Sequence, residues 1–217
     1  MNYNEILLKY IEQCPYDEPI FIEDIKNYFK KIISNNFENV FKNIYVYINR
    51  LVKENKLAQF IKGVYYKPIR GTFGNKRLNS DKVTIKKYIH DDNGQKGYFA
   101  GAYLFNKMGL TTQVPKEILV ITNECPNNNI YYKKNLGIIV KRAKIEINDD
   151  NYKYLQLFDL LVNKEDIKIE VSNPKEIIFN YIENNNLDVE KIFFYANQTK
   201  NIKAIMKLYE LGGTDAK

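Results

Sequence analysis

Amide and cationic side chains recur along one side of the segment from residue 37 to residue 53. At about 100° per residue, its apolar residues from Phe37 to Val52 share one face of a helix. The opposite face contains no carboxylate and carries Asn39, Lys42, Asn43, Val46, Asn49, Arg50 and Lys53. Asparagine can form paired hydrogen bonds with the edge of adenine, and arginine can bond guanine in the same way or bind phosphate. These residues are suited to contact DNA, although a solvated helix surface can have the same composition.

A short hairpin is expected directly after this helix. The stretches LAQFI and VYYKP flank Lys62-Gly63, where glycine permits the positive φ of a tight turn. The hairpin would place Lys62, Tyr65 and Lys67 beside the basic helix. Alternation along the second strand buries either Tyr65 or Tyr66, and the sequence leaves open which one.

Two further helices are expected before the basic helix. NEILLKYIEQC has a helical pattern with Asn4 as its N-cap, and Pro15 ends it. DEPIFIEDIKNYFKKII gives a second short helix, because Ile22, Ile25, Phe29 and Ile32 or Ile33 can share a face. Three helices followed by a hairpin are the order of a winged helix-turn-helix, whose third helix enters the major groove of DNA. Such domains also bind proteins, so the order alone does not establish DNA binding.

The charge of the chain is unevenly distributed. The net charge of the 217 residues is +7, yet residues 42–87 hold twelve lysines and arginines against Glu54 and Asp81 alone. A cluster of this kind can neutralise phosphates and release counterions, which supplies the sequence-independent part of nucleic-acid affinity. Residues 148–217, in contrast, contain more acidic than basic side chains. A lysine-rich solvated surface remains the alternative explanation of the basic cluster.

The remainder of the chain predicts a second, mixed domain. We expect a winged helix-turn-helix at residues 1–70, a basic linker at 71–80 and an α+β domain at 81–217 that is helical from about residue 149. Within the last of these, the pattern predicts helices over 83–89 and 97–110, strands over 117–122, 129–135 and 136–147, and four amphipathic helices after them. The fold class expected for the whole chain is therefore α+β.

No combination of residues predicts catalysis, a metal or a cofactor. His90 stands with two aspartates before a turn-like stretch, and one histidine there lacks the further ligands that a metal needs. Cys14 and Cys125 have no CxxC or cysteine–histidine spacing. Asp149-Asp150 is attributed to a helix N-terminus, and Asp159 to a solvent-facing side. With no phosphate-binding loop, nucleophile elbow or HExxH, we expect a protein that is not an enzyme.

The N-terminal sequence does not predict export. Charged residues interrupt the first fifteen positions, and no run of 18 apolar residues occurs in the chain. The two isolated cysteines also fit a reducing compartment. We therefore expect a cytoplasmic protein without a membrane span.

Two stretches resemble a known family. RLVKENKLAQFIKGVYYKP and KGYFAGAYLFNKMGLTTQVPKEILVITN occur in the order seen in AbiEi-type antitoxins, bacterial transcriptional regulators of type IV toxin-antitoxin systems, and the resemblance covers about residues 1–145. It implies an N-terminal winged helix that binds the promoter of its own operon as an autorepressor. It also implies a C-terminal domain that opposes a nucleotidyltransferase-like toxin. Carried over, it places Asn39, Lys42, Asn43, Asn49 and Arg50 in the groove and Lys62 at the tip of the wing.

Double-stranded DNA and the toxin are thus the expected partners, and the oligomeric state is open, with a dimer on DNA as one form. Two other functions fit the same residues. The winged helix can hold a protein partner without specific DNA binding, or the basic cluster can bind RNA with tyrosines as stacking platforms.

Overall fold

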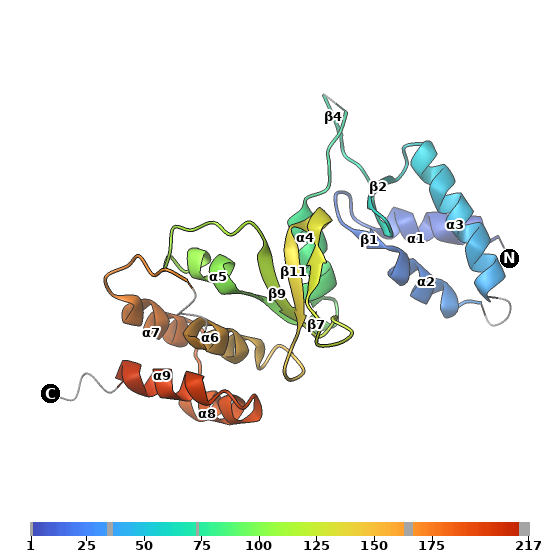
Figure 1. The fold of residues 1–217 in the computed structure, drawn as a ribbon. Coiled ribbons are helices and arrows are strands. Elements are labelled where there is room, and N and C mark those ends of the chain that lie inside the picture. Colours follow the sequence, from blue (N-terminus) through green and yellow to red (C-terminus); the bar gives the residue numbers. More distant parts are fainter. Residues whose placement is uncertain (1, 34–36, 73, 163–166, 213–217) are drawn as a thin grey trace. The chain divides into compact units, whose positions relative to one another are not determined.

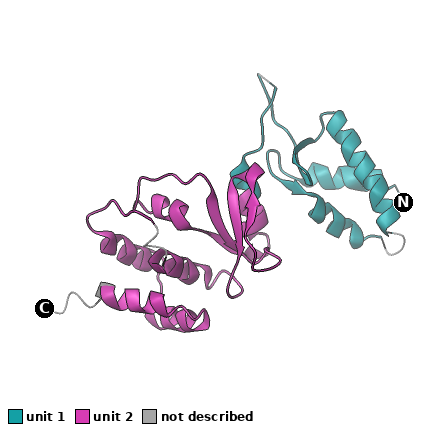
Figure 2. Ribbon diagram, viewed as in Figure 1, with its two compact units in different colours: residues 1–83 teal, residues 84–217 magenta. Residues whose placement is uncertain are grey.

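The computed structural model describes residues 2–33, 37–72, 74–162 and 167–212. The chain divides into two compact units, Met1–Val83 and Thr84–Lys217 (Figure 2). Both contain helices and strands, so the fold is mixed α+β as expected. None of the helices in the described ranges has the length and apolar character needed to cross a bilayer.

Three helices and a small sheet form the body of the first unit. The helices are α1 (Tyr3–Gln13), α2 (Ile22–Lys30) and α3 (Phe37–Lys53), and the strands are β1 (Ile20–Phe21), β2 (Ala58–Ile61) and β3 (Val64–Tyr66). The strand order is β1-β3-β2, and both pairings are antiparallel. Leu7 of α1, Phe29 of α2 and Ile48 of α3 are all completely buried in one shared core. This core fixes which side of α3 faces outward (Figure 1).

Two details of these helices differ from expectation. The N-cap of α1 is Asn2 and not Asn4, because the side chain of Asn2 accepts a hydrogen bond of 3.2 Å from the backbone N–H of Asn4. The second helix begins only at Ile22, because Ile20 and Phe21 pair with β3 as strand β1. Apolar periodicity could not separate these two residues from the helix that follows.

The stretch expected to be a linker contains secondary structure. β4 (Arg70–Gly71) and β5 (Gly74–Asn75) form a second hairpin, which projects from the first unit in Figure 1, and α4 (Ser80–Thr84) follows it. Lys76 and Lys82 tie the stretch back to the unit. The ammonium of Lys76 lies 2.9 Å from a carboxylate oxygen of Asp17, and that of Lys82 lies 3.3 Å from the same oxygen.

The second unit contains a four-stranded mixed sheet. Its strands are β8 (Gly97–Ala100), β9 (Ile118–Thr122), β10 (Tyr131–Lys133) and β11 (Ile138–Arg142). The order is β10-β11-β9-β8, with β9 and β11 parallel and the other pairs antiparallel. A short hairpin of β6 (His90–Asp91) and β7 (Gly94–Gln95) precedes it. The strand predicted over 117–122 is confirmed, the one predicted over 129–135 covers only 131–133, and the one predicted over 136–147 covers 138–142.

Helices cover both faces of this sheet. The π-helix η1 (Ile85–Ile89) packs on the face that contains Val120. Leu119 and Ile121 face the other side, where the helices are α5 (Gly101–Lys107), α6 (Tyr152–Val162), α7 (Pro174–Asn184), α8 (Val189–Gln198) and α9 (Ile202–Gly212). A short 3-10 turn, η2 (Lys134–Leu136), joins β10 to β11. The four helices predicted after residue 149 are therefore confirmed (Figure 1).

The predicted helix over 97–110 is wrong in its first part. Residues 97–100 are strand β8, and only residues 101–107 form helix α5. Gly101 takes a φ of +62°, a left-handed conformation that separates the strand from the helix.

Candidate nucleic-acid interface

The face of α3 that carries the amides and cations is turned away from the core. Ile44, Ile48 and Leu51 on the opposite side have at most 1% of their surface exposed. The exposed residues of the face are Asn39, Lys42, Asn43, Val46, Asn49, Arg50 and Lys53. They lie on one continuous strip because their positions differ by three, four or seven residues. The structure therefore brings all six α3 residues of the predicted site onto one accessible surface, with Val46 in their midst at 67% exposure.

A carboxylate that was not assigned to this surface lies at its C-terminal end. Arg50 donates through Nε to Glu54 at 2.8 Å, and the ammonium of Lys56 lies 2.9 Å from the other oxygen of Glu54. Lys56 and Arg50 together hold the pKa of Glu54 below its usual range. All three side chains are at least one-third exposed, so solvent weakens the ion pairs and Arg50 can exchange Glu54 for another anion at small cost. The sequence reasoning did not assign Lys56 to the interface.

The hairpin of β2 and β3 presents Lys62 at its turn. Gly63 has a φ of +80°, which confirms the positive φ expected there, and Lys62 beside it is exposed. The backbone N–H of Ile22 donates to the carbonyl of Gly63 at 2.9 Å, which ties the turn to the start of α2. The position of Lys62 is therefore set by the body of the unit.

Tyr65 is not a surface residue, and its assignment as a DNA contact is wrong. Tyr65 and Tyr66 are 0% and 5% exposed, so both tyrosines are buried. Alternation does not separate the two here because both faces of β3 are covered: Tyr65 packs in the core shared by the three helices, and Tyr66, on the other face, is buried as well. Burial also raises the pKa of the Tyr65 hydroxyl.

Lys67 is also wrongly assigned to the DNA-contacting surface. Its side chain is only 9% exposed, and its ammonium donates to the backbone carbonyl of Glu12 at 2.9 Å. The same ammonium lies 4.4 Å from the centre of the Tyr16 ring. Lys67 thus satisfies a carbonyl at the C-terminal end of α1, a common role for lysine at a helix end.

The stretch after the hairpin adds further cations to the first unit. Arg70 and Arg77 are exposed, and the guanidinium carbon of Arg77 lies 5.4 Å from the centre of the Phe60 ring on β2. This cation–π contact holds Arg77 beside the β2–β3 hairpin. Arg77 was expected to lie in a tether, whereas the structure gives it a defined position on the unit.

The chain also matches a described protein family. A profile of that family matches residues 20–148, which is more than half of the chain. The chain belongs to DUF6088, a family of unknown function. In this DUF6088 protein the matched part runs from β1 to the loop after β11 and includes α3 and the β2–β3 hairpin. No curated protein matches the chain.

The residues excluded from catalysis occupy ordinary positions in the DUF6088 chain. His90 is exposed and pairs with Gln95 across the β6–β7 hairpin, while Asp91 forms an ion pair with Lys96. Within the described ranges, no three histidine, cysteine or acidic side chains come together as metal ligands. Cys125 is buried and Cys14 is half-buried, and neither forms a disulfide.

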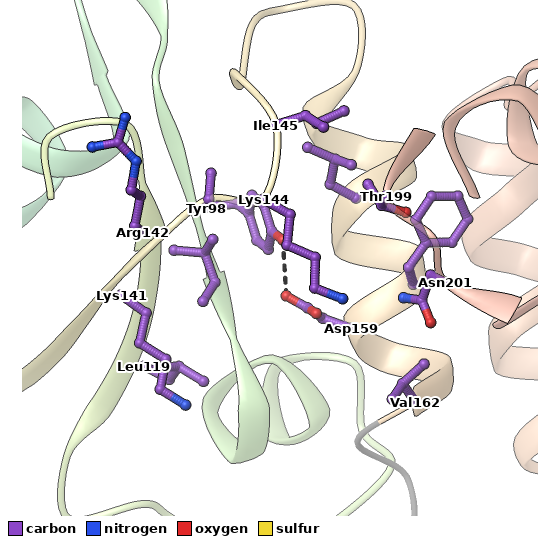
Figure 3. A pocket seen from close by; sticks show the side chains of 14 residues that line it. Tyr98, Leu119, Lys141, Arg142, Lys144, Ile145, Asp159, Val162, Thr199 and Asn201 are labelled. Carbon is purple, nitrogen blue, oxygen red and sulfur yellow. Dashed lines mark hydrogen bonds between the residues drawn. The ribbon is translucent and has the colours of Figure 1, made fainter. Parts of the chain in front are cut away.

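Asp159 is half-buried and does not lie on an open solvent face, so this expectation is wrong. Its carboxylate accepts a hydrogen bond of 2.8 Å from the Tyr98 hydroxyl and lines a pocket in the second unit (Figure 3). Burial raises the pKa of Asp159. The helical pattern of α6 could not reveal this, because the partner Tyr98 lies 61 residues earlier on β8.

Proposed function

We propose that this protein is a DNA-binding transcriptional regulator. In this proposal α3 enters the major groove of double-stranded DNA and the β2–β3 hairpin lies along the adjacent backbone. The observation that carries the proposal is the accessible strip of amides and cations on α3, which is held outward by the buried core and has one carboxylate, Glu54, at its C-terminal end. Asn39, Asn43 and Asn49 supply donors and acceptors for base edges, and Lys42 and Lys53 supply charge for phosphates.

The order of elements in the first unit supports a winged helix-turn-helix. Helices α1, α2 and α3 are followed by a two-strand hairpin whose second strand also pairs with β1, between α1 and α2. In the winged helix-turn-helix as we propose it here, α3 is the recognition helix and the turn at Lys62 is the tip of the wing. Arg77, held on Phe60, would add a phosphate contact next to the wing.

Duplex DNA explains this surface better than single-stranded RNA does. Binding to single strands relies on aromatic rings on which bases stack. The exposed strip of α3 has no aromatic side chain, and Tyr45 and Tyr47 beside it are half-buried. The alternative of a protein-binding adaptor draws on Val46, an exposed apolar side chain in the centre of the strip. The surrounding cations and amides favour the nucleic acid.

We further propose that the protein is an autorepressor and antitoxin. The resemblance of two stretches to AbiEi-type antitoxins supports a role at the promoter of its own operon, and opposition to a nucleotidyltransferase-like toxin by the second unit. In this proposal the chain works by binding, with no reaction of its own. Co-expression with a nucleotidyltransferase-like gene from the same operon tests the second role: rescue of growth by the full chain supports it, and unchanged toxicity contradicts it.

Fluorescence anisotropy tests the DNA-binding proposal. The purified chain is titrated into labelled duplex from its own upstream region and into a scrambled duplex of equal composition. We expect selective binding to the first, and a loss of about tenfold or more in affinity with Lys42→Glu, which reverses a charge at the proposed groove. Lys9→Glu is the matched control, because Lys9 is an exposed lysine on α1 of the same unit.

Two results would contradict the proposal. Equal, weak binding to both duplexes would remove specific DNA recognition. Equal losses of affinity in the Lys42 and Lys9 variants would show that binding depends on the net charge of the chain and not on contacts made by α3. Circular dichroism of both variants checks that each is folded.

A further inference from the structure

A pocket of about 310 Å³ opens in the second unit between the sheet and the helices that cover it. Strands β8, β9 and β11 form one wall, α6 forms another, and the turn between α8 and α9 closes one end (Figure 3). All of these elements belong to the same compact unit. Cavities of this size are at the lower end of those that hold small organic molecules, roughly 300–1,000 Å³.

The pocket combines an apolar lining with a small number of polar groups. Leu119, Ile121 and Phe158 provide apolar surface that an aliphatic or aromatic body can cover. Asp159 lies beside them and accepts from the Tyr98 hydroxyl at 2.8 Å. The carboxylate has a second oxygen, so it can accept a further hydrogen bond from a bound molecule.

Two lysines give the pocket a positive character. Lys141 on β11 and Lys144 in the loop after it line the pocket, and Figure 3 shows the Lys144 side chain extending toward Asp159. Both lysines act on Asp159 through their charge, while the hydrogen bond to its carboxylate comes from Tyr98. Arg142, also at the pocket, turns away and donates to the backbone carbonyls of Cys125 and Pro126 at 2.9 and 3.1 Å. The cations that can meet a ligand are therefore Lys141 and Lys144.

The charges of this pocket select against a cationic ligand. Lys141 and Lys144 outnumber the single carboxylate of Asp159 among the charged side chains that can reach the space. An anion in the pocket is attracted by the charges of both lysines, and it can accept a charge-assisted hydrogen bond from Lys144, whose side chain extends toward Asp159 (Figure 3). An apolar body would then cover Leu119 and Ile121.

We propose that this pocket binds a small organic anion that has an apolar body and one hydrogen-bond donor. Its anionic group meets the ammonium of Lys144 and is also attracted by the charge of Lys141, its body packs on Leu119, Ile121 and Phe158, and its donor meets the free oxygen of Asp159. The site is separate from the α3 surface, and it gives the second unit a ligand-binding function whether or not the first unit binds DNA.

Methyl NMR of the full chain, labelled at isoleucine, leucine and valine, tests this inference. The probes are 4-hydroxyphenylacetate, phenyl phosphate and tyramine. The first two are anions, one a carboxylate with a hydroxyl that can donate to Asp159 and the other a phosphate ester without a donor, while tyramine presents a cation on the same hydroxyphenyl ring. We expect saturable shifts of the Leu119 and Ile121 methyl groups with at least one anion, with a dissociation constant of about 1 mM or below, and no such shifts with tyramine.

Two substitutions must act in opposite directions. Lys144→Glu reverses one cation and is expected to weaken anion binding by about tenfold or more. Asp159→Asn removes the opposing negative charge, keeps an oxygen for the Tyr98 hydroxyl and puts an amide NH₂ where the free oxygen was. It is therefore expected to tighten the binding of phenyl phosphate, which has no donor, and to remove the hydrogen bond of the 4-hydroxyphenylacetate hydroxyl. A general loss of folding would weaken both. Lys191→Glu is the matched control, because Lys191 is exposed on α8 and does not line the pocket.

Three results would overturn the inference: no saturable shift with either anion at concentrations well above about 1 mM, tyramine binding as tightly as the anions, or shifts confined to methyl groups away from the pocket. A loss of affinity in Lys191→Glu equal to that in Lys144→Glu would also overturn it, because long-range charge would then explain the binding. Tighter binding of phenyl phosphate assigns the site to phosphate esters, and tighter binding of 4-hydroxyphenylacetate assigns it to carboxylates.

Discussion

The exposed side chain of Arg50 is held in an ion pair within the chain, and this ion pair competes with phosphate for Arg50. Its Nε lies 2.8 Å from Glu54, and Glu54 is also held by Lys56 at 2.9 Å. A phosphate that binds Arg50 must therefore compete with a carboxylate one helical turn away. Solvent screens this exposed ion pair, so the competition is modest.

The variant Glu54→Gln is expected to bind DNA more tightly. It removes the carboxylate that competes for Arg50 and repels phosphate, so affinity should rise by about two- to fivefold at low salt, with a smaller gain at high salt. Anisotropy titrations at several salt concentrations measure this. Glu190→Gln, at an exposed position on α8, is the control for the change in net charge. Unchanged or weaker binding of Glu54→Gln would show that Arg50 does not contact the DNA.

Asp17 forms a second cluster of charges, and it makes stability depend on pH. Its side chain is 8% exposed, and hydrogen bonds from Lys76 and then Lys82 hold its pKa below the usual value. A lowered pKa means that the ionised carboxylate stabilises the folded state above the unfolded value of about 4, and that this contribution is lost as the pH falls further.

Asp17→Asn is expected to lower the free energy of unfolding at pH 7 by roughly 1–2 kcal/mol, a range reduced for the exposure of Lys76 and Lys82. Asparagine accepts the backbone of this position, where φ is +58°, so the substitution tests the charge and not the conformation. Urea denaturation at pH 7 and at pH 3 measures the difference, which should shrink at pH 3. An equal difference at both pH values would contradict the role of the charge.

Asp159 should affect stability in the opposite direction. Burial raises its pKa, so the folded state favours the protonated carboxyl; that contribution is present below the unfolded value of about 4 and is lost as the pH rises through the folded pKa. Asp159→Asn keeps an acceptor for Tyr98 and removes the buried charge. We expect this variant to melt at a higher temperature than the unchanged chain at pH 8 and to lose that advantage at pH 4. Thermal unfolding followed by circular dichroism at both pH values measures this difference. A lower melting temperature of the variant at pH 8 would contradict the prediction.

At the scale of secondary-structure elements, the sequence predicted what depends on local periodicity. The helix at 37–53, the hairpin around Gly63 and the helices after residue 149 all follow from patterns within a few turns of chain. The outward strip of α3 could be predicted for the same reason. Tyr65 and Asp159 could not, because Tyr65 is buried by side chains from helices α1, α2 and α3 and the surroundings of Asp159 depend on Tyr98. A partner that lies far away in the sequence does not change the local pattern of apolar and polar residues.

The strand at 97–100 was mistaken for helix because the role of its glycine is tertiary. A Cβ atom at Gly97 would collide with the carbonyl oxygen of Tyr88 and lie 2.7 Å from that of Ile121. Only glycine therefore fits between η1 and β9 at this point. The sequence alone does not show whether a glycine lies in a helix or in a strand that a neighbouring backbone approaches closely.

The variant Gly97→Ala is accordingly expected to destabilise the chain strongly. The added methyl group meets backbone atoms that cannot move away singly, so we expect a loss of about 3 kcal/mol or more in the free energy of unfolding. Gly109→Ala is the matched control: Gly109 has a φ of +73° with no atom within 4 Å of the added Cβ, so only backbone strain of about 1 kcal/mol is expected. Urea denaturation compares them, and equal losses would refute the close approach at Gly97.

At the scale of the whole molecule, the basic charge is concentrated before residue 88 and an acidic surplus follows residue 147. This separation of charge favours the binding of an anionic polymer to the N-terminal part of the chain and disfavours its binding to the C-terminal part. Salt dependence can test it, because each phosphate that a lysine neutralises adds about 0.9 to the slope of log affinity against log salt concentration.

Replacing Lys42, Lys53 and Lys62 together by glutamine should therefore reduce that slope by about 3 and weaken binding to every duplex. These lysines are exposed on α3 and at the hairpin turn, and glutamine keeps the helix propensity of α3. The control replaces Lys116, Lys191 and Lys203, which are exposed in the second unit, and removes the same net charge. Its slope should stay unchanged if the phosphates lie along the first unit. Equal reductions in both triple variants would mean that the chain attracts DNA through its overall charge, and the α3 strip would then have no special part in binding.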